Sequence, residues 1–227
     1  MRTSDWEGVW SRGLIVSCQP VVAGPLDRDD IVLAMAQAAA ASGASAVRIE
    51  GVQRVALVAR SLAIPVVGIV KRPVPGSPVF ITPVAEDVRA LAAAGAAVVA
   101  FDATQRTRPS TVPALADAAH ACGVGAMADC ATLADGLQAW QAGCELVGTT
   151  LSGYTADTAV AEDAPPDFGL IRALALQGVR VVAEGRIRTP QQAAEALDSG
   201  ALCVTVGSAI TRVEHITQWF VQALRPR

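Results

Sequence analysis

The chain has 227 residues, is 52% hydrophobic and 17% charged, and carries a formal net charge of -3. A chain this apolar can bury a sizeable core and does not belong to the disordered class. Its charge and the absence of a Lys/Arg block argue against nucleic acid or an anionic membrane as the main partner. It has neither a secretory signal nor an apolar run that could span a bilayer, so we expect a cytoplasmic protein.

Short runs rich in Val and Ile alternate with Ala-rich stretches that are long enough for helices, which is typical of parallel βα units. The eight expected strands are residues 14–19, 46–50, 66–71, 97–103, 125–130, 146–150, 180–185 and 202–207. Asp29 and Asp30 mark the start of the first helix, and Thr132 and Thr189 mark the starts of two later ones.

Eight consecutive units without a linker predict one closed (β/α)8 barrel rather than an open doubly wound sheet. No Gly-rich dinucleotide fingerprint follows the first strand, which weakens the open-sheet alternative further. We expect residues 1–227 to form a single domain, with a short N-terminal extension at 1–12. Two long connections, residues 72–83 and 151–166, follow the third and sixth strands and would lie at the carboxyl-end rim.

Several apolar runs end in a polar residue, and the carboxyl ends of the strands of a closed barrel share one mouth. Lys71 ends the third run and Glu184 ends the seventh, so a candidate base and a candidate acid would face each other. The other polar run ends are Gln19, Arg48, Asp102, Asp129 and Thr150.

Lysine has a reference pKa of about 10.4 and is a poor base at neutral pH unless burial or nearby cations disfavour its charged form. Arg48 and Arg212 are candidate neighbours with this effect on Lys71. A solvated strand end is the simpler explanation for Lys71, and a salt bridge is the simpler one for Glu184. Their joint presence at one predicted mouth favours the catalytic interpretation.

The turns after the seventh and eighth strands are rich in small residues. Many barrels bind phosphate at these two turns. Gly185, Arg186, Gly207 and Ser208 are the candidate phosphate-binding residues, and residues 208–211 would form a short extra helix. Turn geometry alone is the alternative explanation for these glycines.

The remaining polar candidates carry weaker signals. Asp129, and less so Asp102, could orient Lys71 or bind sugar hydroxyls, with structural pairing as the alternative. Arg106 and Arg108 are expected in a solvated loop.

Histidine and cysteine give no sign of a metal site. Only two histidines are present, His120 and His215, and both lie in helical contexts where packing or a surface role is expected. The five cysteines are odd in number and lack zinc-type pairing, so we expect reduced thiols in the core.

In the C-terminal segment, an apolar stripe is expected to pack onto the barrel rather than onto a second subunit. This stripe consists of Ile216, Trp219, Phe220 and Ala223.

A series of motifs resembles the N-acetylmannosamine-6-phosphate 2-epimerase family of sialic acid catabolism over about residues 13–212. In order, these motifs are SCQP, VRIEG, GIVKR, ITPVAEDV, FDATQRTRP, MADCAT, GTTLSGYT, AEGRIRTP and VGSAITR. The chain departs from the usual SCQA, ITPT and ITRP at Pro20, Val84 and Val213, none of which is a proposed catalytic group. The resemblance implies an α/β TIM barrel of the ribulose-phosphate-binding type that interconverts N-acetylmannosamine 6-phosphate and N-acetylglucosamine 6-phosphate.

The resemblance also implies roles for individual residues. Lys71 matches the lysine that moves the C2 proton, and Glu184 matches the carboxylate that assists ring opening or proton traffic at the sugar oxygens. The positions that match substrate contacts are Gln19, Arg48, Asp129 and Arg212. The resemblance further implies a homodimer.

Epimerisation beside an aldehyde requires a base that removes the acidified C2 proton and an acid that returns it to the opposite face. Lys71 and its conjugate acid could supply both, and no metal or redox cofactor is required. One alternative is a lyase or aldolase that forms a Schiff base at Lys71. Another is a noncatalytic barrel that only binds a sugar phosphate.

Overall fold

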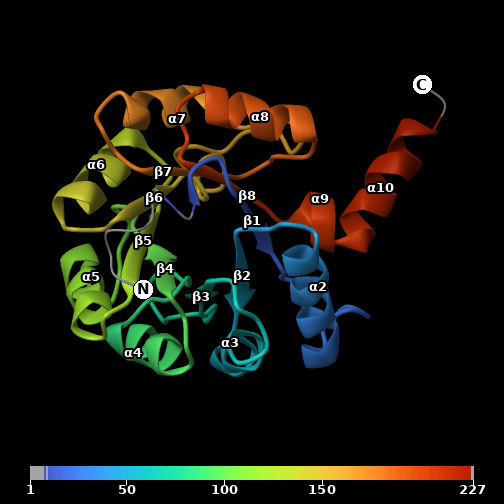
Figure 1. The fold of residues 1–227 in the computed structure, drawn as a ribbon. Helices are drawn as coiled ribbons and strands as arrows, with labels where there is room; N and C mark the ends of the chain where they lie inside the picture. The colour runs from blue at the N-terminus through green and yellow to red at the C-terminus, as the bar shows by residue number, and fades with distance from the viewer. Residues whose placement is uncertain (1–7, 9, 226–227) are drawn as a thin grey trace.

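The computed structural model describes residue 8 and residues 10–225, and it contains the predicted closed barrel (Figure 1). All eight strands are parallel and follow sequence order around the barrel, which β1 closes by pairing with both β2 and β8. The strands are β1 (Leu14–Ser17), β2 (Ala46–Glu50), β3 (Val66–Ile69), β4 (Val98–Asp102), β5 (Gly125–Asp129), β6 (Leu146–Gly148), β7 (Val181–Glu184) and β8 (Cys203–Val206). Most of the predicted extension at 1–12 lies outside the described residues.

Helices alternate with the strands and surround the barrel (Figure 1). They are α2 (Asp29–Ala41), α3 (Val52–Ala59), α4 (Ala85–Ala93), α5 (Val112–Ala121), α6 (Leu133–Gln141), α7 (Phe168–Ala175), α8 (Pro190–Asp198), α9 (Ser208–Thr211) and α10 (Val213–Ala223). The predicted helix starts are confirmed: Asp29 and Asp30 lie in the first turn of α2, and Thr189 caps α8. Thr132 forms a capping box with Asp135 at the start of α6.

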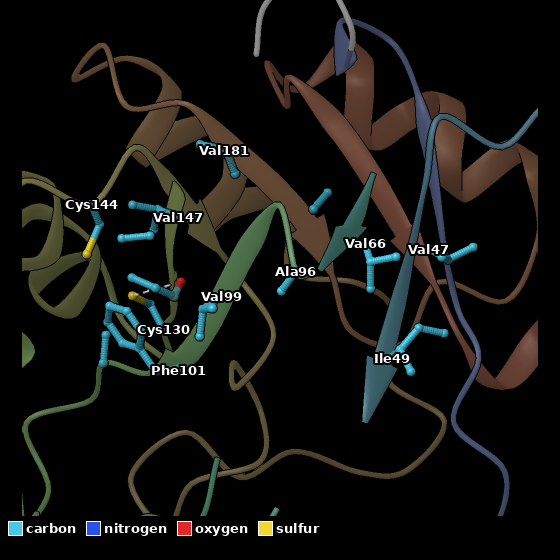
Figure 2. Close-up of a cluster of buried hydrophobic side chains, with 14 of the residues drawn as sticks. Val47, Ile49, Val66, Ala96, Val99, Phe101, Cys130, Cys144, Val147 and Val181 are labelled. Atoms are coloured by element: carbon cyan, nitrogen blue, oxygen red, sulfur yellow. Dashed lines mark hydrogen bonds between the residues drawn. The ribbon is translucent and has the colours of Figure 1, made fainter. Parts of the chain in front are cut away.

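The strands have two buried faces, which explains their nearly continuous apolar runs. In β2, Val47 and Ile49 point outward into the layer of apolar side chains between the strands and the helices, which Figure 2 shows together with Phe101 and Val147. A second, smaller cluster fills the barrel interior and includes Ile69. Because side chains alternate between the faces, residues two positions beyond an interior side chain project toward the mouth.

Except for the second strand, which ends at Glu50 as predicted, the predicted strands run one or two residues too far at their carboxyl ends. The third was expected to reach Lys71, whereas β3 ends at Ile69, and the first was expected to reach Gln19, whereas β1 ends at Ser17. Beyond these points the chain leaves the barrel ladder and enters the connecting loops, where Gln19 is still buried but Lys71 is exposed. The apolar pattern therefore does not mark the residue at which strand pairing ends.

The four cysteines Cys18, Cys130, Cys144 and Cys203 are free and buried, as expected, while Cys122 is free and exposed. Burial raises the pKa of Cys18, Cys144 and Cys203 to about 12, so these thiols stay protonated at neutral pH.

The expectation that the apolar stripe of α10 packs onto the barrel is met only in part, because Trp219 stacks with Arg188 whereas Phe220 and Ala223 are exposed. Helix α10 extends away from the barrel (Figure 1), and none of its residues is buried. Phe220 keeps 68% of its surface exposed. Trp219 alone of the stripe lines the cavity at the mouth. Among the described residues no helix is long and apolar enough to cross a membrane.

Candidate active site

The carboxyl ends of the strands surround a cavity of about 490 Å³. Except for Arg48 and Asp129, which lie in the wall beneath it, every predicted site residue lines this cavity. These lining residues are Gln19, Lys71, Glu184, Gly185, Arg186, Gly207, Ser208 and Arg212. Residues from opposite ends of the chain therefore meet in one space, as a closed barrel requires.

Lys71 stands at the rim of the cavity, two residues beyond Ile69, whose side chain points into the barrel. Partial desolvation in the mouth lowers the pKa of Lys71 from its usual 10.5, and repulsion by the guanidinium groups of Arg48 and Arg212 lowers it further. Glu50 and Glu184 act in the opposite direction. Because the residue as a whole remains exposed, water in the mouth moderates each of these effects.

Arg48 and two carboxylates form a buried network beneath Lys71. The guanidinium of Arg48 donates to both oxygens of Asp129, at 2.5 and 3.1 Å, and its Nη1 also donates to Oε2 of Glu184 at 2.8 Å. Burial alone would lower the pKa of Arg48, but the two carboxylates outweigh it and raise this pKa, so Arg48 is a permanent cation. The network holds the guanidinium of Arg48 rigidly in the wall beneath the cavity.

Glu184 is the member of this network that reaches the cavity. Burial raises the pKa of Glu184 above its usual 4.5, and the charge of Asp129 acts in the same direction against the attraction of Arg48. Thr150 also lines the cavity and donates to Asp129 Oδ1 at 2.7 Å. A carboxyl group with a raised pKa can hold a proton for transfer near neutral pH.

Gln19 and Arg212 follow β1 and β8, which lie between β3 and β7 around the barrel, and the two residues are held together. The Nε of Arg212 donates to the backbone oxygen of Gln19 at 2.8 Å, and the Nε2 of Gln19 donates to Ser17 Oγ at 2.7 Å. The side-chain oxygen of Gln19 is buried without a hydrogen-bond partner among the described residues. Such an unsatisfied polar atom beside a cavity is available to a ligand hydroxyl or amide.

The two glycine turns predicted to bind phosphate both line the cavity. Gly185 has a φ of 112°, a conformation that favours glycine, and Gly207 is the N-cap of the short helix α9. A Cβ atom on Gly207 would lie only 3.3 Å from the Cβ of Ser17, so this turn is packed tightly against β1. The first amide groups of α9, beginning at Ser208, have no partners within the helix.

The side chain of Arg186 binds the 151–166 loop. Its guanidinium donates to the backbone oxygens of Ser152 and Pro165 and stacks on the ring of Tyr154 at 5.6 Å. It therefore ties down the 151–166 loop and does not point toward the phosphate-type turns. The phosphate contact predicted for this turn is made by backbone amides, and it does not involve this guanidinium.

The upper wall of the cavity was not predicted. Arg188 donates to the backbone oxygen of Glu162 and lies 5.1 Å from the centre of the Trp219 ring. Trp219 and His215 are one helical turn apart on α10, and both line the cavity. His215 lies in a helix, as expected, but its position beside the cavity was not predicted. A polar residue and an aromatic residue four positions apart were the only sequence signal.

The motif around Asp102 has a structural role. Asp102 is fully buried and accepts hydrogen bonds from Arg106 Nη2 at 2.5 Å and from Thr104 Oγ1 at 2.7 Å. Arg108 donates to the backbone oxygen of Asp102 at 2.5 Å. Arg106 and Arg108 are therefore not simply solvated, as expected, but rigidify the loop after β4.

The protein is a closed parallel (β/α)8 barrel with a lysine, a carboxylate and two glycine turns around one cavity. In barrels of this class the active site lies at the carboxyl-end mouth. A family model described as "Putative N-acetylmannosamine-6-phosphate epimerase" matches residues 32–226. The chain belongs to this family.

Individual relatives agree with this assignment. The "Putative N-acetylmannosamine-6-phosphate 2-epimerase" of Klebsiella pneumoniae subsp. pneumoniae is 54% identical over 213 residues, which are 94% of this chain and 90% of the relative. The protein of the same name from Proteus mirabilis is 53% identical over 215 residues, with the same coverage of 94% and 90%. The solved N-acetylmannosamine-6-phosphate 2-epimerase from Clostridium perfringens superposes with a TM-score of 0.90, at 39% identity and 96% coverage of both chains.

Proposed function

We propose that this protein is an N-acylglucosamine-6-phosphate 2-epimerase that interconverts N-acetylmannosamine 6-phosphate and N-acetylglucosamine 6-phosphate. The observation that carries this proposal is the position of Lys71, the only lysine among 18 basic residues, at the rim of a cavity that Glu184 also lines. Arginine keeps its proton under all ordinary conditions, so only Lys71 among these cations can act as a base. The family relationship supports the choice of substrate.

In the proposed mechanism the sugar reacts in its open-chain form, in which the aldehyde acidifies the C2 proton. Glu184, with its raised pKa, donates and accepts the proton at the ring and hydroxyl oxygens during ring opening. Neutral Lys71 then removes the C2 proton, and the resulting ammonium group returns a proton to the opposite face of C2. No oxidation state changes, so we propose a reaction that is independent of a cofactor.

The negative charge that develops on the aldehyde oxygen needs a fixed cation. Arg48 is the candidate, because Asp129 and Glu184 hold it rigidly and its charge is permanent. We assign contacts with the sugar to Gln19 and Arg212, which line the cavity. Asp129, which the resemblance also places among the substrate-binding positions, is fully buried and would act on the sugar through Arg48 and Thr150. The substrate phosphate would bind the backbone amides of Gly185, Arg186, Gly207 and Ser208, and it orients the reacting carbon from a distance.

The test is incubation of the purified protein with each sugar phosphate in turn, followed by NMR spectroscopy of both epimers. The expected result is the same equilibrium mixture from either side. The unphosphorylated sugars serve as the matched control and should react far more slowly, because they lack the anchoring group. Absence of interconversion from both sugar phosphates contradicts the proposal.

The partial desolvation of Lys71 also suits a nucleophile, so a Schiff-base lyase or aldolase is the second candidate. The deoxyribose phosphate aldolase from Aeropyrum pernix shares the fold, with a TM-score of 0.63 at 17% identity. Borohydride added with substrate would trap a Schiff base as a mass increase on Lys71. Exchange of the C2 proton without trapping supports the epimerase, and binding without either supports a noncatalytic sugar-phosphate-binding barrel.

We further propose a homodimer, a cytoplasmic location and a single domain for the whole chain. The large apolar side chains that α10 exposes, which include Phe220 and Val221, support a subunit contact. All five cysteines are free, which suits a reducing compartment. A sedimentation measurement that gives a monomer at micromolar concentration contradicts the dimer.

A further inference from the structure

The two strands beside Lys71 separate before they reach the mouth. Strands β3 and β4 pair in register at Val67 with Val98 and at Gly68 with Val99, and the pairing stops there. Strand β4 nevertheless continues to Asp102 along β5. The backbone groups of Val70 and Ala100 therefore need other partners, because buried backbone groups are rarely left unpaired.

Thr82 lies in this gap and supplies those partners. Its backbone N–H donates to the oxygen of Val70 at 2.7 Å, and its Oγ1 accepts from the N–H of Val70 at 3.2 Å. The same Oγ1 donates to the oxygen of Ala100 at 2.7 Å. Thr82, which is fully buried, thus binds both the N–H and the oxygen of Val70 and links them to β4. Val70 directly precedes Lys71.

The backbone of Thr82 is in an unfavourable conformation. Its φ is 44°, in the left-handed region, which a β-branched residue rarely adopts because of steric strain. Glycine would adopt this conformation freely but has no hydroxyl group to bridge Val70 and Ala100. Threonine, although strained, therefore suits this position better than glycine, because it presents both a backbone N–H and a hydroxyl group to Val70.

The following residues extend the same clamp. Lys71 forms an antiparallel bridge with Ile81, and the N–H of Arg72 donates to the oxygen of Phe80 at 3.0 Å. The backbone on both sides of Lys71 is thus fixed, while its side chain has four rotatable bonds and lines the cavity. The direction in which this side chain leaves the barrel depends on how Val70 is held.

We propose that Thr82 is a positioning residue for proton transfer by Lys71. It acts through its hydrogen bonds to Val70 and Ala100, without touching the substrate, by directing the Lys71 amine toward the reacting carbon. This inference rests on the proposed function of Lys71. A displacement of about 1 Å at a reacting group can cost about 100-fold in rate, so a loosened clamp should reduce turnover more than binding.

The test compares two substitutions that differ in the hydroxyl group. Thr82→Val keeps the shape but removes both side-chain hydrogen bonds, and we expect kcat to fall by at least about tenfold with KM changed by less than about threefold. Thr82→Ser keeps the hydroxyl and should retain kcat within about threefold of the original protein. Equal kcat values for both variants and the original protein overturn the proposal.

Thr132→Val is the matched control for a general loss of stability. It removes the hydroxyl that caps α6 by accepting from the N–H of Asp135 at 3.2 Å, and it lies outside the contacts of Lys71. We expect it to lower the thermal midpoint with kcat unchanged. If Thr132→Val lowers kcat as much as Thr82→Val does, Thr82 acts only through stability and the proposal is wrong.

A second readout needs no substrate. Because Lys71 is the only lysine, acetic anhydride labels one ε-amine, and mass spectrometry gives its reactivity at each pH. Thr82→Val should change the pH dependence of this labelling, whereas Thr82→Ser and Thr132→Val should not. Unchanged labelling in Thr82→Val overturns the positioning role. Changed labelling in a protein that epimerises neither sugar phosphate leaves the positioning role intact and contradicts the proposed function instead.

Discussion

Arg48 and Glu184 form an ion pair in which Nη1 lies 2.8 Å from Oε2, and the Arg48 side chain is only 2% exposed. The same guanidinium binds Asp129, which is completely buried. Two carboxylates thus share one cation in a space that water hardly reaches. Removal of the cation from such a group leaves uncompensated buried charge, which is much more costly than breaking a surface pair.

Arg48→Met should therefore destabilise the protein by about 3–5 kcal/mol at pH 8. Urea unfolding measures this loss. The loss should be smaller at pH 5, because protonation of a carboxyl group relieves part of the repulsion between Asp129 and Glu184.

Arg54→Met is the matched control for this prediction. Arg54 also pairs with two carboxylates, those of Asp27 and Asp29, but the pairs lie near the surface. We expect a loss below about 1 kcal/mol at both pH values. Equal losses of stability for Arg48→Met and Arg54→Met would show that breaking the buried network costs no more than breaking an ion pair near the surface.

Glu184→Gln should raise the free energy of unfolding at pH 8. The pKa of Glu184 is raised in the folded chain, so between the unfolded value near 4.5 and the raised folded value the folded state binds more protons and stability falls as pH rises. Glutamine avoids this cost, and Arg48 keeps Asp129 as a partner. Urea unfolding of the variant and the original protein should converge near pH 4. A variant that is less stable at pH 8 than the original would mean that attraction to Arg48 outweighs burial.

The turnover number should rise with pH as Lys71 loses its proton, through a pKa below 10.5. Arg212→Met removes a repelling cation and should shift this rise to higher pH. Glu50→Gln removes an attracting anion and should shift it to lower pH. Both are followed as kcat at saturating substrate, so that weaker binding does not enter. Shifts in the same direction would exclude Lys71 as the group responsible.

Arg186→Met should loosen the 151–166 loop. The loss of two guanidinium hydrogen bonds to Ser152 and Pro165 should raise the rate of limited proteolysis in this loop by roughly tenfold, which corresponds to about 1.4 kcal/mol on its opening. Arg89→Met, on the exposed face of α4, is the control and should leave the cleavage pattern unchanged. An unchanged rate in Arg186→Met would mean that Tyr154 and its neighbours hold the loop without the arginine.

Local patterns were sufficient to predict all eight strands, because each βα unit carries its own apolar run, and side-chain caps mark the starts of α5, α6, α7 and α8. The same patterns placed Lys71 and Glu184 at strand ends, and closure of the barrel then brings them together. A further signal in the sequence went unused. Lys71 is the only lysine in a chain that otherwise uses arginine for every positive side chain.

Other features depend on distances that no local pattern encodes. The role of Thr82 follows from the gap between β3 and β4, which appears only when the ends of the paired strands are known. The side chain of Arg186 reaches carbonyl groups of a loop more than twenty residues earlier in the chain. The direction of α10 depends on the turn at Arg212, whose φ of -109° and ψ of 87° separate α9 from α10.

The most direct test of the central claim is the fate of the C2 proton in deuterated water. The original protein, given either sugar phosphate, should produce both epimers with deuterium at C2. Lys71→Met should produce neither the second epimer nor deuterium at C2, while its unfolding curve stays close to that of the original protein. Deuterium incorporation by a folded Lys71→Met variant at the original rate would contradict the assignment of Lys71 as the base.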